Sequence, residues 1–326
     1  MILRQDRMTS RERMDALFNY RVPDRVSLGA MSTGFNTLNA GYSVADAYNE
    51  PEKSFRAMQW TSEQYAWDPI PQYSGHTILG VMDFGGEVRL PKGKYEGALV
   101  VKSHPVKTEE DIEKLKLPDP KNAGRIPKAM RFSRLQMEHD LPVFFFARSP
   151  FTMAATICSL EQFCKWMMKK PELCHRLMRF AIEHTFNVLN YWVESFGVDR
   201  IFAWMSSPSE SNQVVSPKHV EKFAIPYHIE YHKRLKAIGI KRFGFHICGD
   251  QNLNLPHLAD AAPWPHPSVL SFGHEVDLEV AGRTFPEDII FGNIEPAIIQ
   301  TGTPQKIYDI CKTAIQIGRA SCRERV

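Results

Sequence analysis

The sequence predicts an α/β fold, specifically a (β/α)8 TIM barrel that is truncated before its eighth strand. Short apolar or β-rich runs alternate with longer segments of helical periodicity, which favours a parallel sheet. Seven strand candidates can be counted, and a helical segment follows the seventh. A barrel of this kind closes with eight strands, so an eighth strand is the next element expected.

The strand candidates are spread along most of the chain. They are residues 25–31, 65–71, 142–149, 200–206, 242–248, 268–273 and 289–294, of which the second is the weakest. An open doubly wound sheet is the alternative architecture, but no glycine-rich phosphate loop follows any of these runs. Residues 84–107 have the proline, glycine and lysine residues of turns, which indicates an inserted hairpin.

Capping residues mark the helices. Thr9 or Ser10 is expected to cap the first helix. A later helix is expected to begin after Ser216 and to end at Gly239. Pro226 lies inside it and should break or kink the helix, because proline cannot donate the hydrogen bond that a helix interior needs.

Composition narrows the class of protein. The chain has 326 residues, of which 43% are hydrophobic and 24% charged, as in globular proteins. A formal charge of +3 without a block of lysine and arginine disfavours nucleic-acid binding. No apolar run is long enough for a membrane span, and the N-terminus lacks the pattern of a signal peptide. We therefore expect a cytoplasmic protein.

The last ten residues, "IGRASCRERV", differ in character from the helical pattern before them. They match the translation of a common DNA-sequencing adapter whose next codon is a stop, so we interpret them as adapter read-through. We expect residues 1–316 to form a single TIM-barrel domain and residues 317–326 to be a non-native tail. On this interpretation the natural protein continues past Gln316.

The run "FGFHICG" at residues 243–249 contains the most distinctive chemistry. His246 and Cys248 are two positions apart on a predicted strand, so their side chains share a face. An imidazole and a thiolate are ligands that zinc prefers. The next predicted strand brings Glu275 to the same end of the sheet as a possible third ligand. The alternatives are a hydrogen-bonded core histidine, a small buried thiol and a solvated loop carboxylate.

Five segments in order along the chain resemble the uroporphyrinogen decarboxylase superfamily, and within it the corrinoid-dependent (methylcobamide:thiol) methyltransferase branch. The resemblance covers residues 8–315 and implies a TIM barrel. The segments are "RERMDALFNYRVPDRV", "SPFTMAA", "VVSPKHVEKFAIPY", "FHICGD" and "IIFGNIEPAIIQTGTPQKIY".

The resemblance implies methyl transfer between a methylcorrinoid, supplied by a partner corrinoid protein, and a thiol of the coenzyme M type or a folate. It also implies a zinc ion held by His246, Cys248 and a second cysteine near the end of the chain, which would lie beyond the truncation. Glu275 matches the carboxylate of related zinc methyltransferases. Glu210 and Asn293 are candidates for lining the substrate mouth, or for satisfying loop backbone groups. No catalytic residue is assigned.

Two other functions stay open within this resemblance. Uroporphyrinogen decarboxylase binds the carboxylates of its substrate with an N-terminal Arg-x-x-Gly-Arg segment. The corresponding residues here, 27–44, contain no arginine, which disfavours this function. A non-catalytic corrinoid- or tetrapyrrole-binding member of the family is the other alternative. A zinc hydrolase is disfavoured, because no His-x-His pair occurs on an early strand.

Overall fold

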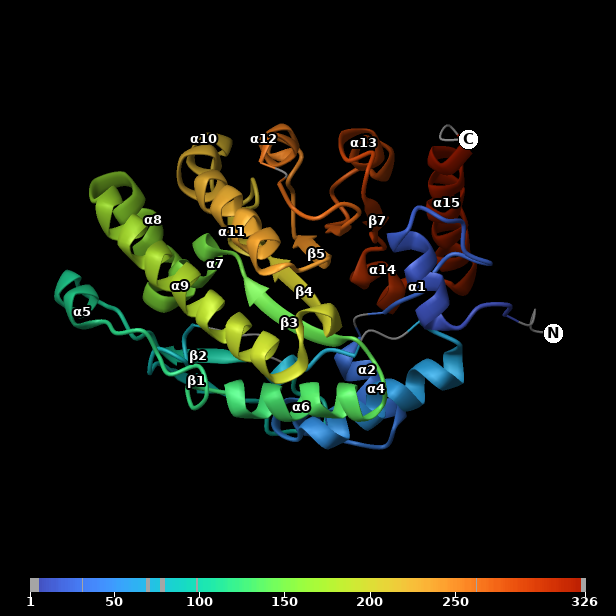
Figure 1. Ribbon diagram of the computed structural model, residues 1–326, viewed down its shortest axis with the longest axis horizontal. Coiled ribbons are helices and arrows are strands. Elements are labelled where there is room, and N and C mark those ends of the chain that lie inside the picture. The colour runs from blue at the N-terminus through green and yellow to red at the C-terminus, as the bar shows by residue number, and fades with distance from the viewer. Residues whose placement is uncertain are drawn as a thin grey trace.

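A parallel sheet of five strands forms the centre of the molecule (Figure 1). The structure is a computed structural model, and it describes residues 6–30, 32–68, 71–76, 80–97, 99–261 and 263–323, apart from the side chains of His76 and residues 318–323. The strands, in their order across the sheet, are β3 (Val143–Arg148), β4 (Ile201–Ser206), β5 (Arg242–Ile247), β6 (Val269–Phe272) and β7 (Ile289–Phe291). All four pairings are parallel, and five of the seven predicted strands are confirmed.

Helices pack along the outer face of this sheet, and Figure 1 shows α6 and α9 beside β3, which both contact. The helices in chain order are α1 (Ser10–Phe18), α2 (Thr33–Asn39), α3 (Val44–Asn49), α4 (Pro51–Tyr65), α5 (Glu109–Lys114), α6 (Ile126–Glu138), α7 (Pro150–Cys158), α8 (Leu160–Lys169), α9 (Pro171–Phe196), α10 (Pro217–His219), α11 (Ile225–Ile238), α12 (Leu255–Asp260), α13 (Leu278–Thr284), α14 (Pro296–Thr301) and α15 (Pro304–Arg323).

Side chains along the strands alternate between two apolar clusters. Phe145 and Phe245 belong to the cluster that the sheet shares with the outer helices. Phe144 and Trp204 belong to a second cluster on the other face, against which Phe18 of α1 packs. Because a parallel sheet is normally buried on both faces, this alternation explains why the strands read as almost continuous apolar runs. The second cluster defines the inner face of the sheet.

Two predicted strands, residues 25–31 and 65–71, are wrong wherever the structure describes them. Helix α4 extends into the start of the second segment, where its longer helical pattern overrides a weak apolar signal. In the first segment, the Leu28 N–H donates to the Asp68 carboxylate at 2.8 Å, and the Asp68 N–H donates to the Leu28 carbonyl at 2.6 Å. A side-chain acceptor thus takes the place of a partner strand.

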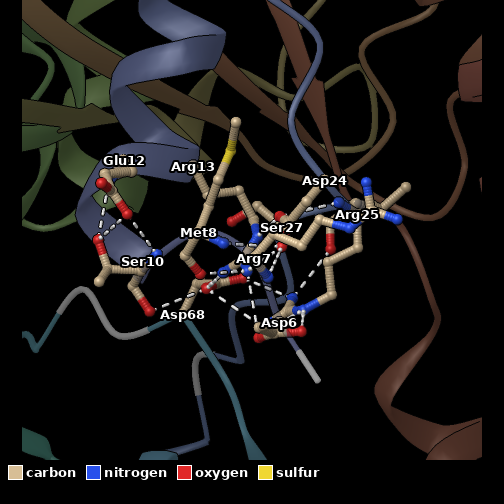
Figure 2. Close-up of polar contacts among 12 residues, drawn as sticks. Asp6, Arg7, Met8, Ser10, Glu12, Arg13, Asp24, Arg25, Ser27 and Asp68 are labelled. Atoms are coloured by element: carbon tan, nitrogen blue, oxygen red, sulfur yellow. Dashed lines mark hydrogen bonds and ion pairs between the residues drawn. The ribbon is translucent and has the colours of Figure 1, made fainter. Parts of the chain in front are cut away.

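A buried ion network holds this N-terminal region together (Figure 2). The Arg13 side chain is fully buried, and its Nε donates to Asp24 Oδ1 at 2.8 Å while its Nη1 donates to Asp68 Oδ1. Arg25 Nη1 donates to the other oxygen of Asp68 at 2.8 Å. The network therefore joins the start of α1, residues 24–28 and the turn after α4.

The predicted hairpin insertion is confirmed. Strands β1 (Glu87–Arg89) and β2 (Val100–Ser103) pair antiparallel within residues 84–107. The first helix cap is also confirmed, because the Thr9 side chain accepts from the Glu12 N–H at 3.2 Å and the Glu12 carboxylate accepts from the Thr9 N–H at 2.8 Å.

The predicted interruption at Pro226 is confirmed as well. Ser216 precedes α10, and a π-helical turn (Val220–Ala224) separates α10 from α11. The missing N–H of Pro226 leaves the regular α-helical bonding pattern incomplete at this point. Gly239 ends α11 in the left-handed conformation, with φ of 92°.

Helix α15 runs continuously from Pro304 to Arg323, across the boundary predicted at residue 316. The prediction that residues 317–326 are non-native stays a prediction. Among the described helices, none has both the length and the apolar composition needed to cross a membrane.

A cavity of about 1300 Å³ opens at the β7 edge of the sheet. Phe146, Trp204 and Phe291 line it from the inner face, and Met14 and Val26 line it from the N-terminal region. The inner face is therefore only partly filled by the side chains that the structure describes.

Candidate functional site

His246 is the residue that places the candidate site at the carboxyl ends of the strands. It lies near the end of β5, in register with Ser206 of β4 and Ser271 of β6. Trp204, two residues before Ser206, belongs to the inner cluster, and side chains two apart on a strand share a face. The His246 side chain is therefore on the inner face of the sheet.

The environment of His246 favours a neutral imidazole. Its Nδ1 is 3.0 Å from the Ser271 hydroxyl oxygen. Burial lowers the pKa of His246 to about 4, and the positive charge of Arg148 adds to this effect. A neutral imidazole is the form that binds metal ions.

Cys248 follows β5 directly and is partly buried. Gly249 comes next with φ of 77°, and a Cβ on it would lie 2.9 Å from the Cβ of Ser211, so the turn requires glycine. Gln251 Nε2 donates to the Cys248 carbonyl at 3.0 Å. Burial and then the Glu275 carboxylate raise the pKa of the Cys248 thiol, whereas Arg148 acts in the opposite direction.

Glu275 lies just beyond β6, close enough to Cys248 to influence its pKa. Its Oε1 accepts from Gln213 Nε2 at 3.4 Å. Its Oε2 is buried without a hydrogen bond to any described residue, although His274 Nδ1 lies 3.5 Å away. A Cβ on Gly273 would come within 2.7 Å of this oxygen, so glycine leaves room for the carboxylate.

These groups fit zinc in their donor types, since they offer nitrogen, sulfur and an oxygen that has no hydrogen bond. Within the described part of the chain, however, no three histidine, cysteine, aspartate or glutamate side chains gather closely enough to hold a metal ion. The zinc site stays a prediction. Binding would require His246, Cys248 and Glu275 to close on the ion.

Glu210 is placed differently from a residue that lines a substrate mouth. It is 1% exposed, its Oε1 accepts from the Ser149 hydroxyl, and its Oε2 is 2.7 Å from His228 Nε2. Its carbonyl accepts from Asn254 Nδ2 at 2.9 Å. The predicted substrate contact stays untested, and these bonds favour a role in joining the loops after β3, β4 and β5.

Asn293 satisfies loop backbone groups, which is the second of the two roles considered for it. Its Nδ2 donates to the carbonyl of Gly273 at 2.9 Å and to that of Val276 at 2.6 Å. These two bonds hold the loop that carries Glu275. The proposed contact with substrate stays a prediction.

Arg148 is the site residue that sequence reasoning missed. It ends β3 in register with Ser206, and its Nη1 donates to the Ser206 hydroxyl at 3.4 Å. Its charge acts on both His246 and Cys248. A signal was present, since an arginine ends the otherwise apolar run "VFFFAR" at an inward-facing position.

The fold resembles that of a known methyltransferase. A solved structure described as a methyltransferase from Methanosarcina mazei superposes with a TM-score of 0.74 at 20% identity, covering 88% of this chain and 83% of that one. Its low identity supports the shared fold only.

Sequence relatives carry two activities. Methylcobamide:CoM methyltransferase MtbA of Methanosarcina acetivorans is 25% identical over 259 residues, which are 75% of this chain and 74% of that protein. Uroporphyrinogen decarboxylase of Myxococcus xanthus is 31% identical over 202 residues, which are 59% of this chain and 54% of that protein. The family model described as Uroporphyrinogen decarboxylase (URO-D) matches residues 9–324, and this chain therefore belongs to the uroporphyrinogen decarboxylase family.

Proposed function

We propose that this protein transfers a methyl group between a methylcorrinoid, carried by a partner protein, and a thiol, at a zinc ion held by His246, Cys248 and Glu275. The observation that carries the proposal is the buried Glu275 Oε2, which has no hydrogen bond in the described residues and lies next to a cysteine. A buried carboxylate oxygen without a hydrogen bond is costly, and a cation beside it would offset that cost. The similarity to methylcobamide:CoM methyltransferases supports the same reaction.

Each residue has a role that follows from its placement. Ser271 orients the His246 ring, and Asn293 orients the loop of Glu275. Gln251 holds the carbonyl of Cys248 and so limits the positions of its sulfur. Zinc, when bound, would lower the pKa of a coordinated thiol and make the thiolate available at neutral pH.

The reaction balances without an added oxidant or reductant. The acceptor thiol loses its proton to solvent, and its sulfur forms a bond to the methyl carbon. The cobalt–carbon bond breaks, and the electron pair stays on the cobalt of the partner's corrinoid. The same site working in reverse, or with a folate as the other reactant, is part of the proposal.

Metal analysis tests the ligand set. We expect the native full-length protein to contain about one zinc ion per chain, because a single N/S/O donor set is proposed. His246→Ala and Cys248→Ala should each lose the ion. Cys164→Ala is the matched control, since Cys164 is another partly buried thiol but lies on helix α8. Zinc content that is unchanged in both site variants would refute the assignment.

An activity comparison tests the reaction. Methylcobalamin and a thiol should yield a methyl thioether, which is measured together with the absorbance change of the cobalt product. The decarboxylase alternative is favoured by the 31% identical relative and is tested with uroporphyrinogen. Release of carbon dioxide without any methyl transfer would establish that alternative. Binding of a corrinoid without either reaction would favour a non-catalytic member of the family.

We also propose that the sheet belongs to a (β/α)8 barrel, with a further strand between β7 and residues 25–30 in the natural protein. The cavity at that position supports this proposal, since its lining includes apolar side chains from both sides. A strand there would also carry the remaining cysteine ligand toward the same end of the sheet.

A further inference from the structure

The loop after β4 lies against the segments that carry the proposed zinc ligands. We call this loop, residues 207–213, the β4 loop. At its start, the Ser207 N–H donates to the His246 carbonyl at 3.1 Å. At its end, Gln213 Nε2 donates to Glu275 Oε1 at 3.4 Å. The two ends of the β4 loop therefore contact two of the three proposed ligand residues directly.

The third proposed ligand, Cys248, is connected to the middle of the β4 loop. The Asn212 N–H donates to the Asp250 carbonyl at 2.7 Å. A Cβ on Gly249 would lie 2.9 Å from the Cβ of Ser211, so the loop packs closely on the turn that follows Cys248. A displacement of the β4 loop would therefore move this turn.

A buried carboxylate anchors the β4 loop. The Ser149 hydroxyl, at the start of α7, donates to Glu210 Oε1, and Nε2 of His228 on α11 lies 2.7 Å from Glu210 Oε2. His228 Nδ1 has no hydrogen bond to any described residue, so an N–H on this ring is satisfied only at Nε2. Helices α7 and α11 contact each other (Figure 1). Rotation of Glu210 would leave buried polar groups of both helices unpaired, which is costly.

Buried hydrogen bonds continue from Glu210 to Cys248. The Glu210 carbonyl accepts from Asn254 Nδ2 at 2.9 Å, and the same nitrogen donates to Gln251 Oε1 at 2.7 Å. Gln251 Nε2 donates in turn to the Cys248 carbonyl at 3.0 Å. Asn254 and Gln251 are 0% and 1% exposed, so water does not compete for these bonds. Two side chains therefore join the backbone at Glu210 to the backbone at Cys248.

We propose that Glu210 is a positioning residue, whose buried carboxylate fixes the β4 loop and thereby places Cys248 and Glu275 for metal binding. This inference rests on the proposed function, since it takes those two residues as zinc ligands. A buried ionisable pair such as Glu210 and His228 contributes little net stability, because the loss of hydration offsets the attraction. Its hydrogen bonds nevertheless restrict geometry strongly. Removing groups that hold metal ligands in position commonly weakens metal binding by about 10–100-fold.

The first experiment measures the order of the Cys248 turn without metal. The metal-free chain is alkylated with iodoacetamide, and peptide mass spectrometry gives the reaction rate of each cysteine. Glu210→Ala should raise the rate at Cys248 by about fivefold or more, because the lost hydrogen bonds let the turn open more often. Cys164 on α8 should react at its wild-type rate in the same sample, which distinguishes a local effect from general loosening.

Asp83→Ala is the matched control for the loss of a buried acid–histidine pair. Asp83 Oδ2 lies 3.0 Å from His184 Nε2, and the two side chains are as buried as those of Glu210 and His228. His184 Nδ1 also lacks a hydrogen bond to any described residue. This variant should also destabilise the fold, but it should leave the labelling of Cys248 unchanged.

Glu210→Gln separates hydrogen bonding from side-chain volume. The amide oxygen can still accept from Ser149, but the amide N–H₂ would face the N–H of His228 Nε2. Moving that proton to Nδ1 would leave it without a described acceptor. Labelling of Cys248 in Glu210→Gln should therefore lie between wild type and Glu210→Ala.

Asn254→Ala cuts the hydrogen-bonded path and leaves the Glu210 carboxylate with both of its partners. It should also raise the labelling rate of Cys248. This variant keeps the inference testable if Glu210→Ala does not fold.

The second experiment measures zinc affinity of the full-length protein by competition with a chromophoric chelator. Glu210→Ala should bind zinc at least about tenfold more weakly than wild type, because its ligands are less well ordered before binding. Asp83→Ala should bind zinc as wild type does, although both variants lose a buried carboxylate.

The outcomes separate this inference from the proposed function. Unchanged labelling of Cys248 in Glu210→Ala, or an equal increase in Asp83→Ala, overturns the positioning role. Equal zinc affinity in Glu210→Ala and wild type also overturns it. A wild-type protein that binds no zinc refutes the proposed function, whereas labelling of Cys248 that depends on Glu210 in that protein still supports the role of Glu210 in ordering the turn.

Discussion

Gly244 shows how a single residue sets the shape of the candidate site. It lies two positions before His246 on β5, and the Trp204 indole occupies the space where a side chain would be. The position of the Trp204 indole over β5 therefore depends on the absence of a Cβ at Gly244. The same run "FGFHIC" contains both the glycine that makes room for the Trp204 indole and the two predicted zinc ligands.

Gly244→Ala should destabilise the protein by about 1–3 kcal/mol, which is typical of overpacking in a well-packed core. Trp204 cannot move away easily, because it packs in the inner cluster with Phe144 and Phe202. Gly282→Ala is the control, since no atom lies within 4 Å of the added Cβ and alanine favours the helix α13 in which it lies. Urea unfolding measures both variants, and equal stability of Gly244→Ala and wild type would contradict this packing.

Among the secondary-structure elements, the N-terminal segment is held in place by ion pairs rather than by the strand pairing that the sequence predicted. The "RERMDALFNYRVPDRV" segment, part of the family resemblance, supplies Arg13, Asp24 and Arg25 to the network in Figure 2. Asp68 joins them from the turn after α4. These residues therefore have a structural explanation that does not involve substrate.

Arg13→Met should cost about 3–5 kcal/mol of unfolding free energy, because it removes the buried positive charge that pairs with both Asp24 and Asp68. The side chains of Arg13 and Asp68 are each only 1% exposed. Arg11→Met is a control on the same helix, since Arg11 pairs with Asp140 at a site where the two side chains are 47% and 64% exposed. That surface pair should be worth about 0–1 kcal/mol. Similar losses in both variants, measured by urea unfolding, would contradict the buried network.

The network should also make stability depend on acidic pH. The hydrogen bond from Arg13, followed by the N–H groups of Arg7 and Met8, holds the pKa of Asp24 below its ordinary value. The unfolded carboxyl group has a pKa of about 3.9, so this contribution is complete above about pH 4 and is lost as the pH falls further. Unfolding free energies between pH 3 and pH 7 should fall at the acidic end.

Asp24→Asn should reduce that acid sensitivity, whereas Asp309→Asn on the exposed face of α15 should leave it unchanged. A pH profile of Asp24→Asn that parallels wild type would show that another carboxyl group causes the loss.

For the whole molecule, the important feature is the cavity at the β7 edge. It exposes parts of the inner face, including Phe146 and Trp204, and the N-terminal segment lies opposite. Val22 and Val26 in that segment are 80% and 51% exposed, which indicates apolar surface that a further element would cover.

A longer version of the chain, in which the native reading frame continues past Gln316, should therefore melt at a higher temperature. We expect a rise of roughly 5 °C or more, since each kcal/mol shifts the melting temperature by about 2–4 °C in domains of 150–250 residues. Thermal unfolding of the two versions, followed by circular dichroism, makes the comparison. Identical cooperative transitions would contradict both the proposed further strand and the interpretation of the tail.

The sequence by itself determined the five parallel strands, the hairpin, the helix caps and the position of His246 near the end of a strand. These features depend on local alternation and on residues close in the chain. Tertiary structure decided which distant residues meet. It replaced a predicted strand with the Asp68 network, buried Glu210 and brought Arg148 beside the histidine and cysteine. Such contacts depend on three-dimensional packing, which periodicity in one segment cannot encode.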